Sequence, residues 1–292
     1  NAVTMEGETK TDNNGNSGTI YSGVVTDAAG NEIVSYNGVL SGLNTWNRLN
    51  DLKDTQNWYA YDSDAYLQRG DTELFFNNNL VFSSSAAENT IVLNDTVDLG
   101  IGYAEFAGGK FSIVSEMKTE EGQQVSEGNL FNHAGYVIHE GAEVHLKLVN
   151  PEEYMTEWRK TGAGALYIDG SGNTNALLNV GGSGTTYLQQ TGGYAAYNVL
   201  ASSGATVEIA DTDQIKRDFT FGAGGGVLNM NGNSMVWNND NGADADGFTI
   251  HALDELAMVA NLTSGTTATL TWTQGDSRTF LGSFRDNGKD SS

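Results

Sequence analysis

The stretch Gly184-Thr-Thr-Tyr-Leu-Gln, followed twenty residues later by Gly204-Ala-Thr-Val-Glu-Ile, decides the fold of this chain. In each copy a glycine precedes a short run in which polar and apolar residues alternate. Such alternation predicts a β-strand with one buried face, and the glycine marks a turn before that strand. Further copies of the unit begin at Gly141, Gly164, Gly225 and Gly265.

The spacing of these copies predicts stacked coils. Their first glycines lie 23, 20, 20, 21 and 40 residues apart, and the interval of 40 spans two units. Weaker copies near Glu88 and Gly108 extend the pattern to about 74–275. A single unit cannot bury its apolar face, whereas stacked units can. We therefore expect an all-β chain built on a right-handed parallel β-helix, or β-solenoid, with coils of about 20 residues. A β-sandwich or barrel is the structural alternative.

The same pattern predicts the core and the domain limits. We expect 1–73 to form an N-terminal cap or junction, 74–275 to form the β-helix, and 276–292 to form a tail or the start of a further coil. The first segment is rich in aromatic residues but shows no clear period, as befits a cover for the end of a solenoid. The residues expected to point into the core are Val144, Leu146, Leu166, Ile168, Leu188, Val207, Ile209, Leu228 and Met230.

The amino-acid composition and the net charge exclude several classes of function. The 292 residues carry 37 acidic and 14 basic side chains, a net charge of −23 that repels nucleic-acid phosphates and anionic lipid headgroups. We expect neither nucleic-acid binding nor membrane contact by this segment. The absence of cysteine excludes disulfides, a thiolate zinc site and a cysteine nucleophile. The 37 glycines and single proline suit short strands joined by tight turns.

Four segments carry a family resemblance, in the same order and at similar separations as in the family. They are Asn89-Thr-Ile-Val-Leu-Asn-Asp-Thr-Val-Asp-Leu-Gly-Ile-Gly-Tyr-Ala-Glu-Phe, Lys160-Thr-Gly-Ala-Gly-Ala-Leu-Tyr-Ile-Asp-Gly, Leu178-Asn-Val-Gly-Gly-Ser-Gly-Thr-Thr-Tyr-Leu-Gln-Gln and Gly224-Gly-Gly-Val-Leu-Asn-Met-Asn-Gly-Asn-Ser-Met-Val-Trp. Together they resemble the β-helical passenger region of the serine protease autotransporters, the group of the immunoglobulin A proteases and their enterobacterial relatives. The resemblance covers roughly 74–275.

This resemblance implies a location and a role. It implies a passenger that is secreted or displayed at the cell surface of a Gram-negative bacterium, with an outer-membrane translocator barrel in the parent protein. The family's Gly-Asp-Ser-Gly-Ser-Pro motif is absent, so we expect any protease domain to lie outside this chain. The main hypothesis is a rigid stalk or scaffold that adheres to host glycan or extracellular protein.

Two alternative functions are kept. In the first alternative, the chain is a supporting part of a secreted serine endopeptidase whose catalytic domain lies outside it. In the second, the chain is a polysaccharide-processing β-helix enzyme. Lyases of anionic sugars need basic side chains and hydrolases need paired carboxylates, and no spacing in this sequence marks either set.

The segment Gly275-Asp-Ser277 partly matches the motif around the nucleophile of serine proteases, and His251 and Asp254 lie upstream of it. The next residue is Arg278, where trypsin-like enzymes place the glycines of the oxyanion hole. We therefore expect this chain to have no catalytic residues, no cofactor and no enzyme activity of its own.

Two patterns suggest metal ligands without establishing a site. His133, His139 and His145 are spaced six apart, but Gly135 and Gly141 interrupt any common strand. The acidic run from Asp240 to Gly247 resembles the start of a calcium loop, yet the frame places Gly242 and Leu253 at the two anchoring positions. The prediction is no designed metal site, and weak calcium binding by the acidic run stays open.

Five aromatic residues are candidates for ligand contact, because aligned rings can stack against sugars. Packing of like residues in ladders is an equally good use for them. The five are Tyr167, Tyr187, Tyr194, Tyr197 and Trp237.

Overall fold

A computed structural model of the chain describes residues 89–90, 104–115, 117–120, 135–149, 157–237, 248–252, 254–272 and 280–286, and adds the strand assignment of some further residues. Regular structure in the described part is β-strand, apart from one 3-10 turn, η1 (Thr212–Gln214). The chain forms two units, Asn1–Val149 and Asn150–Ser292.

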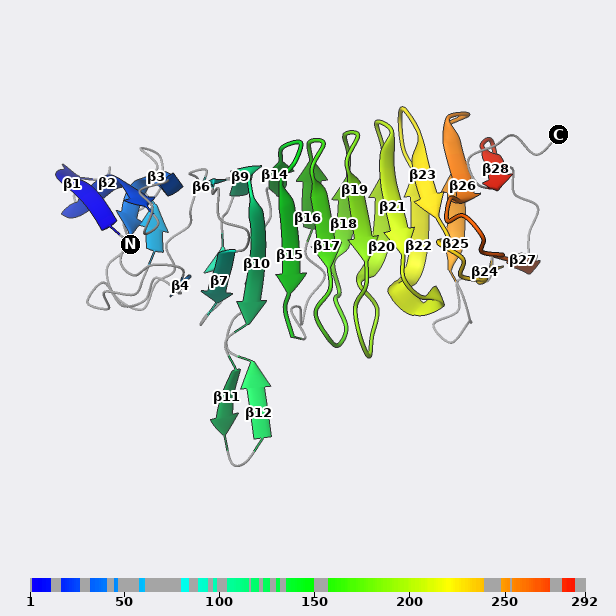
Figure 1. Cartoon of the computed structure of the whole chain (residues 1–292), viewed down its shortest axis with the longest axis horizontal. Coiled ribbons are helices and arrows are strands. Elements are labelled where there is room, and N and C mark those ends of the chain that lie inside the picture. Colours follow the sequence, from blue (N-terminus) through cyan, green and yellow to red (C-terminus); the bar gives the residue numbers. More distant parts are fainter. Residues whose placement is uncertain are drawn as a thin grey trace. The chain divides into compact units, whose positions relative to one another are not determined.

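The second unit consists of parallel strands, most of which alternate between two sheets, while β24 and β27 pair with each other in a third. Sheet I has the order β16-β18-β20-β22-β25, and sheet II has the order β17-β19-β21-β23-β26-β28. Each strand therefore pairs with a strand of the next coil and not with its neighbour in sequence (Figure 1). This connectivity is that of a parallel β-helix and confirms the fold class predicted from the sequence. The strands are β16 (Glu157–Thr161), β17 (Ala165–Ile168), β18 (Leu177–Val180), β19 (Thr185–Leu188), β20 (Ala196–Ala201), β21 (Ala205–Ile209), β22 (Ile215–Phe221), β23 (Gly226–Asn229), β24 (Met235–Asn238), β25 (Thr249–Ala252), β26 (Ala257–Asn261), β27 (Leu270–Thr273) and β28 (Ser283–Asp286).

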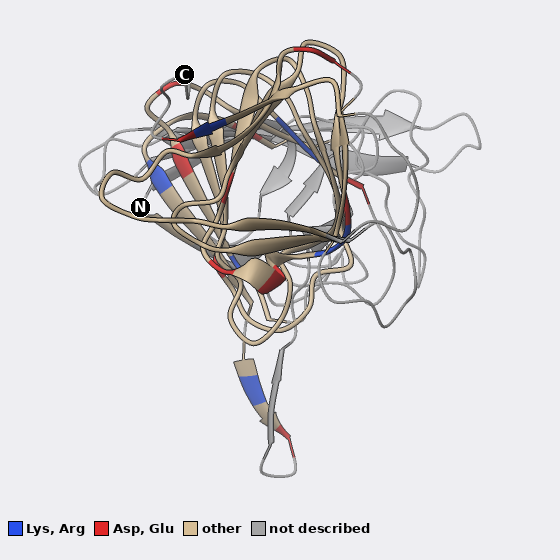
Figure 2. Ribbon diagram, turned by 90° about the vertical axis from the view of Figure 1, so that its right-hand side faces the viewer, with Lys and Arg blue, Asp and Glu red and all other residues tan. Residues whose placement is uncertain are grey.

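The core of this unit is built from rows of inward side chains. Because successive side chains in a strand point to opposite faces, every second residue of β17, β19 and β21 is buried. Register carries one inward row through Val207 to Leu228 and on to Val259. Viewed end-on, the coils wind around a common interior (Figure 2). All nine predicted core residues are at most 5% exposed, which confirms them.

The first unit combines antiparallel and parallel strands. β1, β2 and β3 form an antiparallel meander, and β6 then pairs antiparallel with β3 and parallel with β9. From there β9 pairs with β14, and β10 pairs with β7 and β15, all in parallel. The division at residue 73 between cap and coils stays a prediction. The strands are β1 (Ala2–Thr11), β2 (Ser17–Thr26), β3 (Glu32–Leu40), β4 (Thr45–Trp46), β5 (Trp58–Ala60), β6 (Leu80–Ser83), β7 (Asn89–Leu93), β8 (Val97–Asp98), β9 (Ala104–Gly108), β10 (Lys110–Ser115), β11 (Met117–Glu120), β12 (Gln123–Ser126), β13 (Leu130–Phe131), β14 (Tyr136–Ile138) and β15 (Glu143–Lys147).

One element was not anticipated from the repeat. Strands β11 and β12 pair only with each other, antiparallel, and project from the coils as a hairpin (Figure 1). All four residues of β11 are exposed. The hairpin interrupts the coil between β10 and β15, so that Gly108 lies 33 residues before Gly141 instead of about 20.

Glycine at the turn before β19 is required by close contact between coils. The backbone N–H of Gly184 donates to the carbonyl oxygen of Gly162 at 3.3 Å. A Cβ on Gly184 would overlap the carbonyl oxygen of Gly164 and the Nζ of Lys160. Only a residue without a side chain lets these two turns approach so closely.

Gly184→Ala is therefore expected to lower the free energy of unfolding by about 2 kcal/mol, because the overlapped carbonyl belongs to the backbone and cannot rotate away. Gly181→Ala is the matched control, since a Cβ there would meet its nearest neighbour, the Oγ of Ser202, at an ordinary 3.6 Å. Urea unfolding of both variants measures the difference. Equal stability of the two variants would contradict the close packing of the coils.

Candidate binding surfaces of the second unit

Tyr167 and Tyr187 lie side by side on the outer face of sheet II. They are register partners on β17 and β19, and their ring centroids are 4.4 Å apart with the planes inclined by 7°. Each ring thus covers one face of the other. This geometry uses the rings as a ladder between coils and leaves their edges, rather than the faces between them, for contact with a ligand.

Tyr194 lies in the turn before β20, and Tyr197 lies at the start of that strand. Their centroids are 6.5 Å apart in an edge-to-face arrangement, and the Tyr194 hydroxyl donates to Oδ1 of Asn175 at 2.5 Å. Burial, with a smaller contribution from Tyr197, raises the pKa of Tyr194. Tyr194 therefore holds a fixed orientation, with its hydroxyl already engaged.

An open cleft of about 500 Å³ adjoins this corner. The side chain of Gln214 closes one wall: its Oε1 accepts from the backbone N–H of Gln190 at 2.7 Å, and its Nε2 donates to the Gln190 carbonyl at 3.0 Å. Asp211 accepts from the backbone N–H of Thr212 at 2.6 Å and begins η1. The cleft is lined by Gln190, Gly192, Gly193, Tyr194, Asp211, Thr212, Asp213, Gln214, Ile215 and Lys216.

Trp237 was expected to be available for contact with a ligand, and the structure corrects this expectation because the residue is buried. It is 2% exposed, and its ring stacks on Trp272 with centroids 4.8 Å apart and planes inclined by 7°. The cause is the parallel pairing of β24 with β27, which places Trp272 directly over Trp237. The exposed tryptophan of this pair is Trp272, at 45%.

A second hollow, which we call the sheet I groove, crosses the outer face of sheet I and has a volume of about 390 Å³. Two outward rows run along it from coil to coil. One passes through Glu157, Leu177, Asn198 and Asp218, and the other through Arg159, Asn179, Leu200, Thr220 and His251. The groove is lined by Glu157, Leu177, Leu178, Asn179, Asn198, Val199, Leu200, Asp218, Thr220 and His251.

Both carboxylates of the groove have basic neighbours. Glu157 accepts from Arg159 at 2.7 Å and from Nδ2 of Asn179 at 3.3 Å. The hydrogen bond to Glu157 raises the pKa of Arg159, so its guanidinium stays charged. At the other end, Asp218 lies 3.5 Å from Nε of Arg217 and 3.5 Å from Nε2 of His251. Each end of the groove thus carries an acidic side chain with basic side chains beside it.

These carboxylates do not form a glycosidase pair. Glu157 and Asp218 stand three strand spacings apart in the same row, which corresponds to about 14 Å. Acid and base in glycoside hydrolases are separated by at most about 9.5 Å. The groove is therefore better suited to binding than to hydrolysis. Sequence reasoning missed it because only the register brings these residues together.

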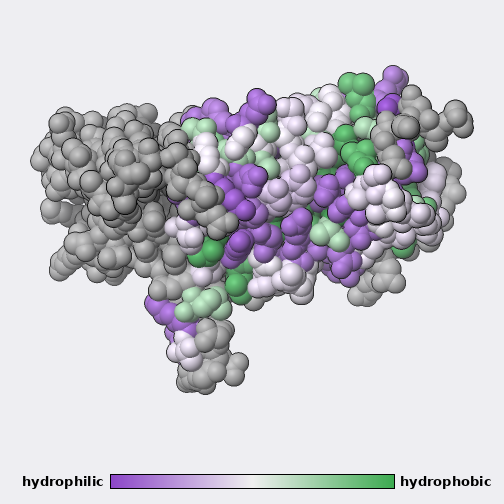
Figure 3. Space-filling model, viewed as in Figure 1, coloured by the Kyte–Doolittle hydropathy of each residue, from purple (hydrophilic) through white to green (hydrophobic). Residues whose placement is uncertain are grey.

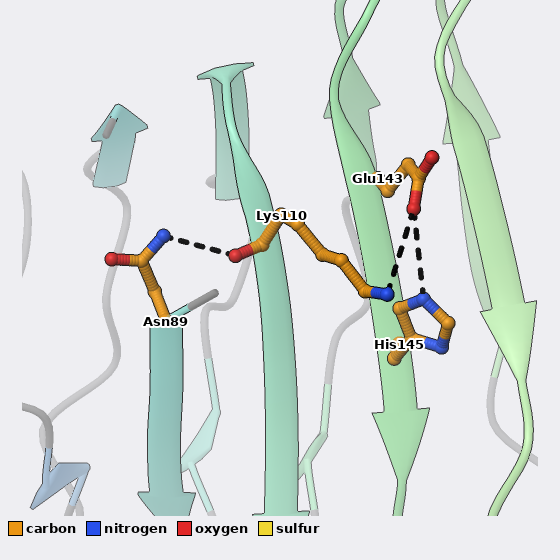
Figure 4. Close-up of polar contacts among 4 residues, drawn as sticks. All are labelled: Asn89, Lys110, Glu143 and His145. Carbon is orange, nitrogen blue, oxygen red and sulfur yellow. Dashed lines mark hydrogen bonds and ion pairs between the residues drawn. The ribbon is translucent and has the colours of Figure 1, made fainter. Parts of the chain in front are cut away.

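The described members of the evenly spaced histidine set have separate partners. Nε2 of His139 lies 2.7 Å from Oε1 of Glu105, whereas Nε2 of His145 lies 3.9 Å from Oε2 of Glu143. Figure 4 shows His145 beside Glu143, which also lies 4.0 Å from Nζ of Lys110. His133 is outside the described residues. Among the residues that the structure describes, no three His, Cys, Asp or Glu side chains gather around a common point.

The two described residues of the possible serine protease triad, His251 and Asp254, have other partners. His251 pairs with Asp218, and Asp254 accepts from the backbone N–H groups of Gly224 at 2.9 Å and Leu256 at 2.8 Å. These hydrogen bonds lower the pKa of Asp254, which stabilises the turn in its ionised form. Ser277 and the acidic run 240–247 lie outside the described residues. No described helix is long and apolar enough to cross a membrane.

The fold and the coil-to-coil rows define a β-helical protein. Comparison with known proteins shows which proteins it resembles. No protein-family model matches the chain. The chain is 29% identical to an immunoglobulin A1 protease autotransporter of Haemophilus influenzae, over 63% of its length and 11% of that protein. It is 30% identical to the serine protease SepA autotransporter of Shigella flexneri, over 57% of the chain and 12% of that protein.

A third relative is the adhesion and penetration protein autotransporter of Haemophilus influenzae, 27% identical over 68% of the chain and 13% of that protein. The chain thus spans about an eighth of the length of these relatives. The comparisons confirm the resemblance to serine protease autotransporters. They also confirm the secreted or cell-surface location in a Gram-negative bacterium that the resemblance implies.

Proposed function

We propose that this chain is a rigid β-helical segment of an autotransporter passenger, which acts as a stalk or scaffold at the bacterial surface and adheres to host glycan or extracellular protein. The parent protein, on this proposal, carries an outer-membrane translocator. The observation that carries the scaffold role is the set of side-chain ladders that join one coil of the second unit to the next.

These ladders are of several chemical kinds. Tyr167 stacks on Tyr187, and Trp237 stacks on Trp272. Contacts between an amide and a carboxylate add hydrogen bonds, as where Nδ2 of Asn229 donates to Oε2 of Glu208 at 2.7 Å. Each contact ties a coil to its neighbour in addition to the backbone ladder, so bending requires several contacts to break together. This architecture suits a spacer that holds other domains apart.

The adhesive role rests on the outer rows and on charge. Equivalent side chains repeat along the coils, and such rows suit extended partners better than compact ones. On the face drawn in Figure 3 the described surface is mostly hydrophilic or neutral. The net charge of −23 disfavours polyanionic partners, so we propose uncharged glycans or matrix proteins.

An array of neutral glycans, heparin and matrix proteins, probed at two ionic strengths, tests the adhesive role. We expect weak binding to neutral glycans that changes little with salt, and little or no binding to heparin at low salt. Strong, salt-sensitive binding to heparin would contradict the electrostatic argument. Binding to nothing on the array would remove adhesion and leave the scaffold role alone.

A second candidate function is support of a serine endopeptidase domain elsewhere in the parent protein. The similarity to an immunoglobulin A1 protease autotransporter and to the serine protease SepA autotransporter favours it. The full reading frame decides between the candidates. A Gly-Asp-Ser-Gly run upstream of the coils would support the peptidase candidate, and an upstream sequence without one would leave the scaffold and adhesion proposal.

A further inference from the structure

We propose that the sheet I groove is the site at which the chain binds glycan, and that its ligand is an uncharged oligosaccharide lying across the strands of sheet I. This inference rests on the adhesive part of the proposed function and adds a location, a ligand class and named contacts to it.

Two leucines of the groove, one from each row, are suited to the apolar face of a sugar ring. Leu177 and Leu200 come from adjacent strands, β18 and β20, and Leu200 is 36% exposed. Leaving a leucine side chain in water is unfavourable by about 25 cal/mol for each Å² of apolar surface. A ring laid over these two side chains removes that surface from water.

Hydrogen-bonding groups lie next to both leucines. Asn179 and Thr220 flank Leu200 in its own row, and Asn198 follows Leu177 in the other row. Amides and hydroxyls both donate and accept, which matches the hydroxyl groups around a sugar ring. The groove volume of about 390 Å³ falls in the range of small-ligand sites, about 300–1,000 Å³.

The charges of the groove favour a neutral ligand. Glu157 is paired with Arg159, and Asp218 has Arg217 and His251 beside it. A cationic ligand would have to displace an arginine from its carboxylate. An anionic ligand would meet the field of a chain with net charge −23. An uncharged ligand avoids both costs.

An extended peptide is the less suitable occupant. The strands of sheet I beneath the groove already pair with the strands of neighbouring coils, as β18 does with β16 and β20. A peptide lying on the face of a sheet therefore cannot add to it as a further strand, which is the usual source of main-chain affinity. A sugar needs only the side chains that the face presents.

Two variants with matched controls test the site. Leu200→Asn removes the more exposed of the two groove leucines, and Leu262→Asn changes a leucine of similar exposure, 38% against 36%, that does not line the groove. Thr220→Val removes one hydroxyl of the groove without changing side-chain shape, and Thr206→Val does the same on the outer face of sheet II. Thermal unfolding checks that all four variants keep the wild-type fold.

The probes are cellotetraose, chitotetraose, maltotetraose and lacto-N-tetraose, with a hyaluronan tetrasaccharide as the anionic arm and an extended hexapeptide as the peptide arm. Binding is measured by saturation-transfer NMR and titration calorimetry. We expect at least one neutral tetrasaccharide to bind, with affinity reduced about tenfold by Leu200→Asn, reduced by Thr220→Val, and unchanged by either control.

The outcomes separate the inference from the proposed function. Neutral-sugar binding that all four variants retain would overturn the groove as the site while leaving adhesion in place. Preference for hyaluronan or for the hexapeptide would overturn the ligand class. Binding of none of the probes, together with no binding on the glycan array, would overturn the inference and the adhesive role, but not the scaffold role.

Discussion

Replacing Ile209 by aspartate should lower the free energy of unfolding by about 4 kcal/mol or prevent folding. Ile209 is 1% exposed on β21, and its register partner Leu188 lies inside the same core. A carboxylate there loses its hydration among apolar neighbours and must either stay charged without a partner or take up a proton. Either course costs far more than the lost packing of the isoleucine alone.

Urea unfolding followed by circular dichroism measures this effect. Thr206→Asp is the control, because Thr206 lies on the same strand but its side chain is on the outer face of the sheet. The control should change the unfolding free energy by no more than about 1 kcal/mol. Similar losses in both variants would mean that the inward and outward faces of β21 are wrongly assigned.

The second large effect concerns Lys160, a lysine buried in the core of the second unit. It is 1% exposed, and its Nζ donates to the carbonyl oxygen of Gly162 at 2.8 Å. Burial lowers its pKa from 10.5 to about 8. The folded state therefore holds the ammonium group less favourably than the unfolded state does, at a cost of about 3 kcal/mol near pH 7.

Lys160→Met should accordingly raise the free energy of unfolding at pH 7 by about 2 kcal/mol. Removing the buried charge contributes about 3 kcal/mol, and the loss of the hydrogen bond to Gly162 offsets about 1 kcal/mol. Methionine is the replacement because it fills the same elongated space without a polar atom in need of a partner.

The advantage of the methionine variant should depend on pH in a defined direction. Between pH 8 and 10.5 the unfolded chain binds more protons at this lysine than the folded chain, so the wild type gains stability as the pH rises. The advantage should vanish near pH 10, where the remaining cost of the charge equals the lost hydrogen bond to Gly162, and should reverse at higher pH. Lys216→Met, at an exposed lysine, should show no such trend. A pH-independent difference for Lys160→Met would contradict the lowered pKa of this buried lysine.

The sequence predicts the coils well because the information is local. Glycine at the turn and strict alternation within each strand occur inside a single unit, so Leu188 or Val207 can be assigned to the core without knowledge of any partner. The parallel direction follows from the superperiod, since consecutive strands of like kind must be joined by a full coil. The β11–β12 hairpin has no such signal, because it interrupts a coil without repeating.

Features that depend on the register between distant strands are harder to predict from the sequence. Trp237 is buried because Trp272 covers it from a strand far along the chain, and no local pattern announces that pairing. The sheet I groove draws on five strands, so its residues share no motif. Lys160 stands in an inward position of β16, where an apolar residue is the ordinary expectation. The burial of this lysine reflects tertiary packing around glycine turns.

Engineered disulfides test the parallel stacking of coils most directly, because the chain contains no cysteine of its own. Thr185 and Thr206 are register partners, as are Thr206 and Val227, on the outer face of sheet II. Adjacent strands about 4.8 Å apart place such partners within disulfide reach, whereas Thr185 and Val227, two spacings or about 10 Å apart, are beyond it. We expect the pairs Thr185→Cys/Thr206→Cys and Thr206→Cys/Val227→Cys to form intramolecular disulfides under mild oxidation, and the pair Thr185→Cys/Val227→Cys to remain reduced. Failure of both adjacent pairs, or ready formation of the distant one, would contradict the parallel β-helix.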